Sequence, residues 1–110
     1  MDPDQLARIR RQLLDQPGPI EDEPEALDAE LARLDVEAGT ARSDVETAAT
    51  FRRRAWVLAR LARHRGGRWN QLADEAVNAW HQQEGAAVSE AVRDQLAAEA
   101  ELWLSRHAHG

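Results

Sequence analysis

The chemistry that this sequence could perform is concentrated in one arginine-rich segment. Residues 51–68 contain seven arginines and no acid, which gives a formal charge of +7, whereas residues 1–50 carry −8 and residues 69–110 carry −5. At about 100° per residue, four of these arginines fall on one side of a helix with a tryptophan among them. We call this candidate partner-binding set the Arg/Trp face; it consists of Arg52, Arg53, Trp56, Arg60 and Arg63. Guanidinium groups pair with carboxylates and stack on indole rings, so the face predicts binding to an acidic partner.

Two other interpretations of the Arg/Trp face stay open at the level of sequence. An acidic second helix containing Glu30, Asp35 and Glu37 could pair with the arginines and bury Trp56 at a helix–helix seam. Alternatively, the arginines could bind nucleic-acid phosphates, because basic and aromatic side chains are interleaved on such surfaces. The net charge of −6 disfavours this alternative, since the remaining chain would repel a polyanion. The expected partner is therefore another protein with an acidic surface or helix.

The histidines and carboxylates form no recognisable catalytic or metal-binding pattern. His107 and His109 stand close together near the C-terminus, but a structural zinc site needs two further ligands, so adventitious metal binding is favoured over a native site. The sequence has no cysteine and no Glu-x-x-His pair of the kind that builds a di-metal centre in a helical bundle. We therefore expect no catalytic residues, no metal, no cofactor and a function other than catalysis.

Helices should position these residues. Ala, Leu, Arg, Glu and Gln are abundant, while β-branched and aromatic residues are sparse, which favours an all-α fold. Apolar spacing of three and four residues predicts helices at about 3–16, 24–38, 43–64, 68–83 and 87–105. Short connections predict an antiparallel up-and-down helical bundle of four to five helices, forming a single domain over residues 1–110. The first helix would dock across the bundle or pair with another copy.

Proline and glycine mark the predicted boundaries. Residues 16–25 hold three prolines and four acids, which predicts an extended acidic loop, and its part from Glu21 to Glu25 is a possible second contact. Gly39, Gly66-Gly67 and Gly85 are predicted to end the second, third and fourth helices. The fifth helix is then predicted to turn five positions inward: Val88, Val92, Leu96, Ala100 and Trp103.

The segment from Ala55 to Trp80, AWVLARLARHRGGRWNQLADEAVNAW, resembles one helix–turn–helix unit of the tetratricopeptide type. Trp56 stands near its start, glycine marks the turn, and Trp69 follows the turn. The turn holds an extra residue, Gly67, and no second copy appears at the family's period of about 34 residues. The resemblance implies a helical hairpin, and that family's role as peptide-binding scaffolds agrees with an interaction protein. A helix-turn-helix DNA reader fits less well, because its recognition helix would carry two exposed acids.

The remaining features concern location and assembly. The acidic start and the absence of a long apolar run predict a cytoplasmic protein with no membrane span. All fourteen basic residues are arginine, which is typical of a GC-rich genome and suggests a bacterial source. Trp103, flanked by Leu102 and Leu104, could form a homodimer contact. The sequence therefore indicates an adaptor or small regulatory subunit of a larger bacterial assembly, or alternatively a nucleic-acid-associated regulator using the same arginines.

Overall fold

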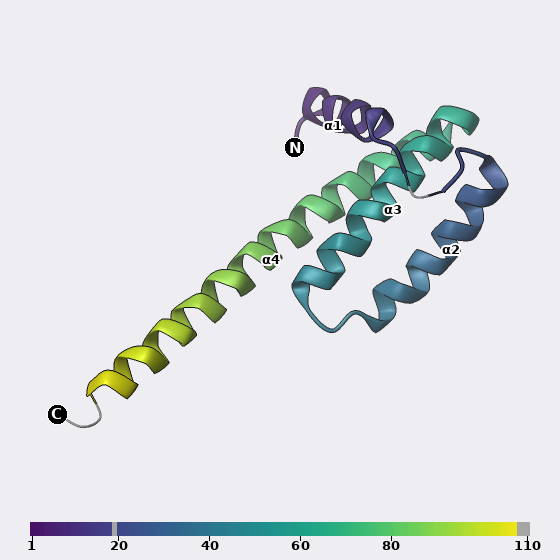
Figure 1. The fold of residues 1–110 in the computed structure, drawn as a ribbon. Helices are drawn as coiled ribbons and strands as arrows, with labels where there is room; N and C mark the ends of the chain where they lie inside the picture. The colour runs from purple at the N-terminus through teal and green to yellow at the C-terminus, as the bar shows by residue number, and fades with distance from the viewer. Residues whose placement is uncertain (19, 108–110) are drawn as a thin grey trace.

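The computed structural model describes residues 1–18 and 20–107, and every regular element in them is an α-helix (Figure 1). The helices are α1 (Pro3–Asp15), α2 (Pro24–Thr40), α3 (Asp44–Arg65) and α4 (Arg68–His107). The predicted all-α class is confirmed for these residues. Within the described chain, none of the four helices combines the length and the apolar composition that crossing a lipid bilayer requires.

Side-chain caps fix where two helices begin. The carboxylate of Asp2 accepts from the backbone N–H of Gln5 at 2.8 Å, and the Gln5 side chain accepts in return, so α1 starts in a capping box with Pro3 in its first turn. Ser43 caps α3 by accepting from the backbone N–H of Glu46 at 3.1 Å. The predicted start of the third helix at Ser43 is thereby confirmed.

The predicted break at Gly85 is wrong, because α4, which is 40 residues long, passes through this position without interruption. Among the described glycines only Gly66 and Gly67 have a positive φ, and these two form the turn between α3 and α4. A glycine inside a helix costs roughly 1 kcal/mol relative to alanine, which the flanking Gln, Glu and Ala residues offset. The last two predicted segments are therefore one helix of roughly 60 Å.

α3 lies at the centre of the packed region and is covered on several sides. It contacts α1, α2 and α4, and all eight residues of 55–62 are buried. A helix with neighbours all around buries its whole circumference, and α3 does so over these two turns. The other helices complete the core with Leu13, Leu27, Leu34, Ala73, Ala76 and Val77.

α1 packs on α3 and α4 at the end of the molecule far from His107 (Figure 1). Arg10 in α1 donates to the carboxylate of Asp74 at 3.2 Å and to the amide oxygen of Asn70 at 2.8 Å, both in α4. Of the two placements predicted for the first helix, docking against the other helices is the one observed.

The C-terminal half of α4 projects beyond the other helices (Figure 1). α3 begins beside Glu90, whose side chain accepts from the backbone N–H of Asp44 at 2.7 Å, and every residue from 91 to 107 is exposed. The radius of gyration is 18.4 Å, whereas a compact chain of this length would have about 13 Å. The predicted inward packing of the fifth helix is wrong, because no described helix lies beside these exposed positions: Val88, Val92, Leu96, Ala100 and Trp103.

Candidate functional site

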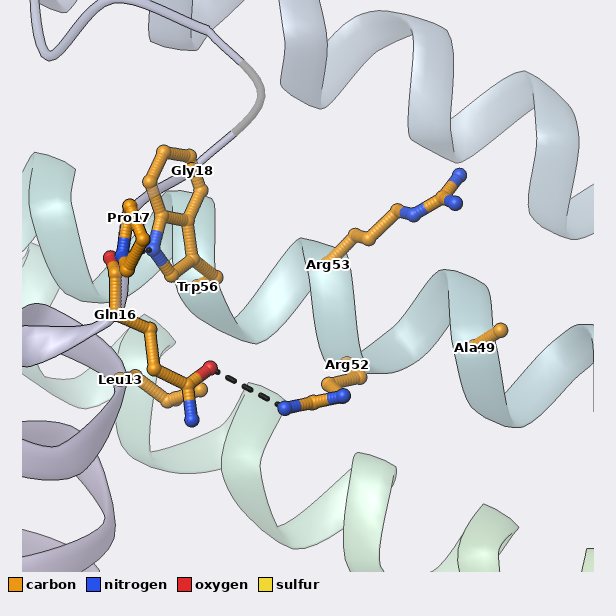
Figure 2. A pocket seen from close by; sticks show the side chains of 8 residues that line it. All are labelled: Leu13, Gln16, Pro17, Gly18, Ala49, Arg52, Arg53 and Trp56. Atoms are coloured by element: carbon orange, nitrogen blue, oxygen red, sulfur yellow. Dashed lines mark hydrogen bonds between the residues drawn. The ribbon is translucent and has the colours of Figure 1, made fainter.

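The Arg/Trp face lies on α3 where the chain leaving α1 crosses it. Pro17 cannot continue a helix, so α1 ends and the following residues pass over α3. They leave a cavity of about 360 Å³. It is lined by Leu13, Gln16, Pro17, Gly18, Ala49, Arg52, Arg53 and Trp56 (Figure 2). The cavity thus joins apolar walls to two arginines of the predicted face.

Trp56 belongs to the interior, with 7% of its surface exposed. Its indole Nε1–H donates to the backbone carbonyl of Gln16 at 3.2 Å, so its one polar group is satisfied. The ring lies so close to Gly18 that a Cβ atom at that position would stand 1.8 Å from the ring carbon Cζ2. Only glycine fits there, and the α1–α2 loop, not the acidic helix α2, covers the indole.

Arg60 is buried beside Trp56 and joins α3 to the end of α1. Its guanidinium donates to the carbonyl of Leu14 at 3.2 Å and to the carbonyl of Gln16 at 2.7 Å. Carbonyls at a helix C-terminus lack intrahelical partners and carry partial negative charge, so a cation stabilises them. The guanidinium also lies 4.4 Å from the centre of the Trp56 ring, within the range of a cation–π interaction.

Asp22 in the α1–α2 loop is the main counter-charge of this region. Its carboxylate accepts from Arg60 at 2.8 Å and from Arg63, and it lies 3.0 Å from the ring nitrogen Nε2 of His64. Partial burial raises the pKa of Asp22, but the hydrogen bond with His64 and the charges of Arg63 and Arg60 outweigh it, so the pKa is lowered overall. Asp22 therefore holds the loop against α3 as a carboxylate.

Three other arginines of α3 also have acidic partners, all of them in α2, and one of these is Arg53, which lies 3.8 Å from Glu37. Arg54 pairs with Asp35 at 3.0 Å, and Arg65 pairs with Asp28 through two hydrogen bonds of 2.9 and 2.6 Å. The hydrogen bond from Arg65 is the largest influence on Asp28 and lowers the pKa of that carboxyl. Of the acids predicted to pair, Asp35 and Glu37 do face α3, whereas Glu30 pairs with Arg33 in its own helix.

The structure brings the five residues of the Arg/Trp face together but does not expose them equally. Trp56 and Arg60 are buried, which agrees with the open interpretation in which the indole is covered within the fold and the arginines pair internally. Arg53 and Arg63 keep about half of their side-chain surface exposed. Figure 2 shows Arg52 turned toward Gln16, whose side-chain oxygen accepts at 3.2 Å, while Arg53 extends away from the cavity wall. Arg52, Arg53 and Arg63 are the members of the face that remain exposed, although Arg53 lies 3.8 Å from Glu37 and Arg63 pairs with Asp22. Their binding role stays a prediction.

The contacts of Asp22 with α3 were not predicted, because acidic partners for the arginines were expected only in the second helix. A run of acids directly after a proline–glycine break, in a chain with an arginine-rich helix, was the available signal for Asp22. The cluster of arginines was recognised in the sequence. Its acidic partner Asp22, however, lies 38 residues from Arg60 in the chain, and helical periodicity does not relate residues so far apart.

A second candidate surface lies on the projecting half of α4. We call it the α4 stripe; it consists of Val88, Val92, Leu96 and Trp103, which are 49–64% exposed and fall within a sector of roughly 80° on the helix. Leu102 and Leu104 flank it and are also exposed. Contiguous exposed apolar side chains of this kind are typical of protein or membrane interaction sites, of ligand-binding grooves and of aggregation-prone surfaces.

The described residues contain no group of three or more His, Cys, Asp or Glu side chains that could hold a metal ion. His107 stacks on Trp103 with 4.3 Å between ring centres, and its Nδ1–H donates to the Trp103 carbonyl at 2.8 Å. His109, the other member of the predicted histidine pair, lies outside the described residues.

Comparison with known proteins adds no constraint on the site. No protein-family model, no curated protein and no solved structure matches this chain.

Proposed function

We propose that this chain is a non-enzymatic protein-interaction module, acting in the cytoplasm as an adaptor or small regulatory subunit of a larger bacterial assembly. In this proposal the packed region is an antiparallel up-and-down bundle that forms a single domain with α4. The bundle serves as a rigid base, and the projecting half of α4 is the binding element. The observation that carries the proposal is the exposure of every residue from 91 to 107 together with the α4 stripe.

Helix energetics support a bound state for this segment. Seventeen residues of helix without tertiary contacts are marginal in water, because helical stability in proteins comes mostly from packing of an apolar face. The α4 stripe extends over about 22 Å of helix, a length that suits helix-in-groove recognition through anchors three or four residues apart. Trp103 supplies the residue type most enriched at binding hot spots. A partner that covers the stripe would therefore stabilise the helix and be bound by it.

The remaining arginines offer a second contact in this proposal. Arg52 and Arg53 border the cavity beside Trp56, and Arg63 lies further along α3 with about half of its side chain exposed. An acidic side chain or a C-terminal carboxylate could bind at the cavity mouth, with apolar walls for the rest of the group. The exposed acids Glu21 and Glu23 of the α1–α2 loop and Glu25 in the first turn of α2 would extend the same surface.

The alternative function is a nucleic-acid-associated regulator that uses the same three arginines. The internal pairing of Arg53, Arg60 and Arg63 with carboxylates disfavours it, because phosphates would have to displace these acidic partners. An acidic protein partner at the same arginines would meet the same competition. Titration with a random duplex and a single strand at low salt separates the two functions. Affinity that falls steeply as salt increases would favour the regulator, and absence of binding would remove it.

In-cell photo-crosslinking tests the proposed function. A photo-reactive residue replaces Leu96 in the stripe, and in a matched control it replaces Asp94, which lies on the opposite side of the helix. We expect a discrete crosslinked product at position 96 and a much weaker one at position 94. Equal products at both positions, or none at either, would refute recognition through the stripe.

A further inference from the structure

We propose that the partner covering the α4 stripe is a second copy of this chain, with residues 85–107 of the two copies pairing antiparallel about a two-fold axis at Leu96. This inference rests on the proposed function, since it identifies the occupant of the same surface. Three features of the structure support it: the length of the free helix, the position of α1, and the distribution of side-chain size and charge.

The register of the pair follows from the part of α4 over which the side that carries the stripe is not covered by α1. Asp74 and His81 fall in the same angular sector of α4 as the stripe, and α1 occupies that sector there, since Arg10 binds Asp74 and α1 side chains surround His81 in one surface hollow. The sector becomes free about one turn later, at Gly85, and the described helix ends at His107. The midpoint of residues 85–107 is Leu96, so full overlap of two such segments in opposite directions places Leu96 at the two-fold axis.

The position of α1 excludes the parallel arrangement. In a parallel pair, each α4 would carry its own α1 at the same height on the face turned toward the partner. The two α1 helices would then occupy the space between the two α4 helices, whose axes must approach to about 8–10 Å for side-chain packing. In the antiparallel pair the two α1 helices lie at opposite ends, beyond the region of overlap.

Side-chain size and charge favour the same direction. The free segment begins with small residues, Gly-Ala-Ala-Val-Ser at 85–89, and ends with Leu-Trp-Leu at 102–104. Antiparallel pairing about Leu96 sets Trp103 level with Ser89, so large side chains meet small ones and can interdigitate. It also sets Glu99, which interrupts the stripe, level with Arg93, whereas a parallel pair would set Glu99 against its own copy. The segment is therefore complementary to itself in one direction only.

Sedimentation equilibrium of the purified chain tests the pairing. We expect a monomer–dimer equilibrium with a dissociation constant of about 1–500 µM. Leu96→Glu places two like charges at the two-fold axis and should raise the dissociation constant at least 100-fold. Ala97→Glu adds the same charge one residue later, on the side away from the stripe, and should change the constant less than about threefold. A monomer at 500 µM, or equal effects of the two substitutions, would overturn the proposal.

Spin-label distances test the direction. The sequence has no cysteine, so Ser105→Cys gives a single labelling site per chain. Two such labels are about 27 Å apart along the axis of an antiparallel pair centred on Leu96, and only one helix diameter apart in a parallel pair. A short distance would overturn the antiparallel arrangement even if the chain dimerises.

The photo-crosslinking experiment separates failure of this inference from failure of the proposed function. A product at position 96 with twice the mass of the chain supports self-pairing. A product of another mass, combined with a monomer in sedimentation, would overturn self-pairing and leave recognition of a different protein through the stripe intact. No product at position 96 would contradict both.

Discussion

Substitution of Gly18 by alanine tests whether the α1–α2 loop seals Trp56. A Cβ atom at position 18 would lie 1.8 Å from Cζ2 and 2.0 Å from Cη2 of the indole, whereas carbon atoms in contact stand about 3.5–4.0 Å apart. The ring or the loop must therefore move by more than an ångström. φ is not positive at Gly18, so the expected effect is steric and not due to backbone strain.

The magnitude follows from the two contacts that such a movement disrupts. Overpacking costs about 1–3 kcal/mol, and loss of the hydrogen bond from the indole to Gln16 costs about 0.5–1.5 kcal/mol. We expect Gly18→Ala to lower the free energy of unfolding by about 2–4 kcal/mol, measured by urea denaturation followed by circular dichroism. That is a large part of the 5–15 kcal/mol typical of a native protein.

Two comparisons make the Gly18 result specific. Gly39→Ala is the matched control, because a Cβ there meets nothing within 4 Å, so its effect should be neutral or stabilising by up to about 1 kcal/mol. In a Trp56→Leu background, the cost of Gly18→Ala should fall below about 1 kcal/mol, because the atoms that clash are gone. If Gly18→Ala were as harmless as Gly39→Ala, the loop would not lie on the indole and the buried arrangement would be wrong.

Three further perturbations address the charges and the long helix. Arg60→Ala should lower the free energy of unfolding by about 2–4 kcal/mol, because it leaves buried carbonyls and a carboxylate without a donor, whereas exposed Arg53→Ala should cost less than about 0.5 kcal/mol by the same denaturation assay. The lowered pKa of Asp22 stabilises the fold above the unfolded value of about 3.9, and this contribution is lost as the pH falls through the folded pKa. Unfolding from pH 7 to pH 2 should therefore show a shallower acid loss for Asp22→Asn than for wild type; identical profiles would contradict the role of this carboxylate. Gly85→Ala should raise the thermal midpoint, with a gain of about 1 kcal/mol, because the position is helical and open; a loss would show that α4 bends there.

The local features of the fold could be predicted because they depend on near neighbours in the chain. The caps at Asp2 and Ser43 and the turn at Gly66-Gly67 follow from residue types within three or four positions. Gly85 was misinterpreted because a glycine ends a helix only when the chain turns after it, and nothing near Gly85 forces a turn. Whether a helix continues through a glycine is decided by what packs on either side, which periodicity does not report.

The candidate site could be predicted only in part. Periodicity correctly grouped Arg60, Arg63 and Trp56 on one side of the third helix, but a helical wheel treats each helix as having one buried side. Here α3 is surrounded, so its polar side is covered by a loop whose position no local rule specifies. Asp22, the residue that holds that loop, was therefore missed. The stripe on α4 was identified from its spacing but was predicted to face the core, whereas its side chains are exposed. The sequence does not reveal that α4 projects beyond the other helices.

Amide hydrogen exchange at two protein concentrations tests whether a second copy covers the α4 stripe while α3 stays the enclosed core of each chain. We expect strong protection of residues 55–62 at both about 5 and about 500 µM, because the fold buries them within one chain. Residues 91–107 should exchange rapidly at the low concentration and become protected at the high one, as the second copy covers them. Equal protection of residues 91–107 at both concentrations, whether strong or absent, would contradict self-pairing through the stripe.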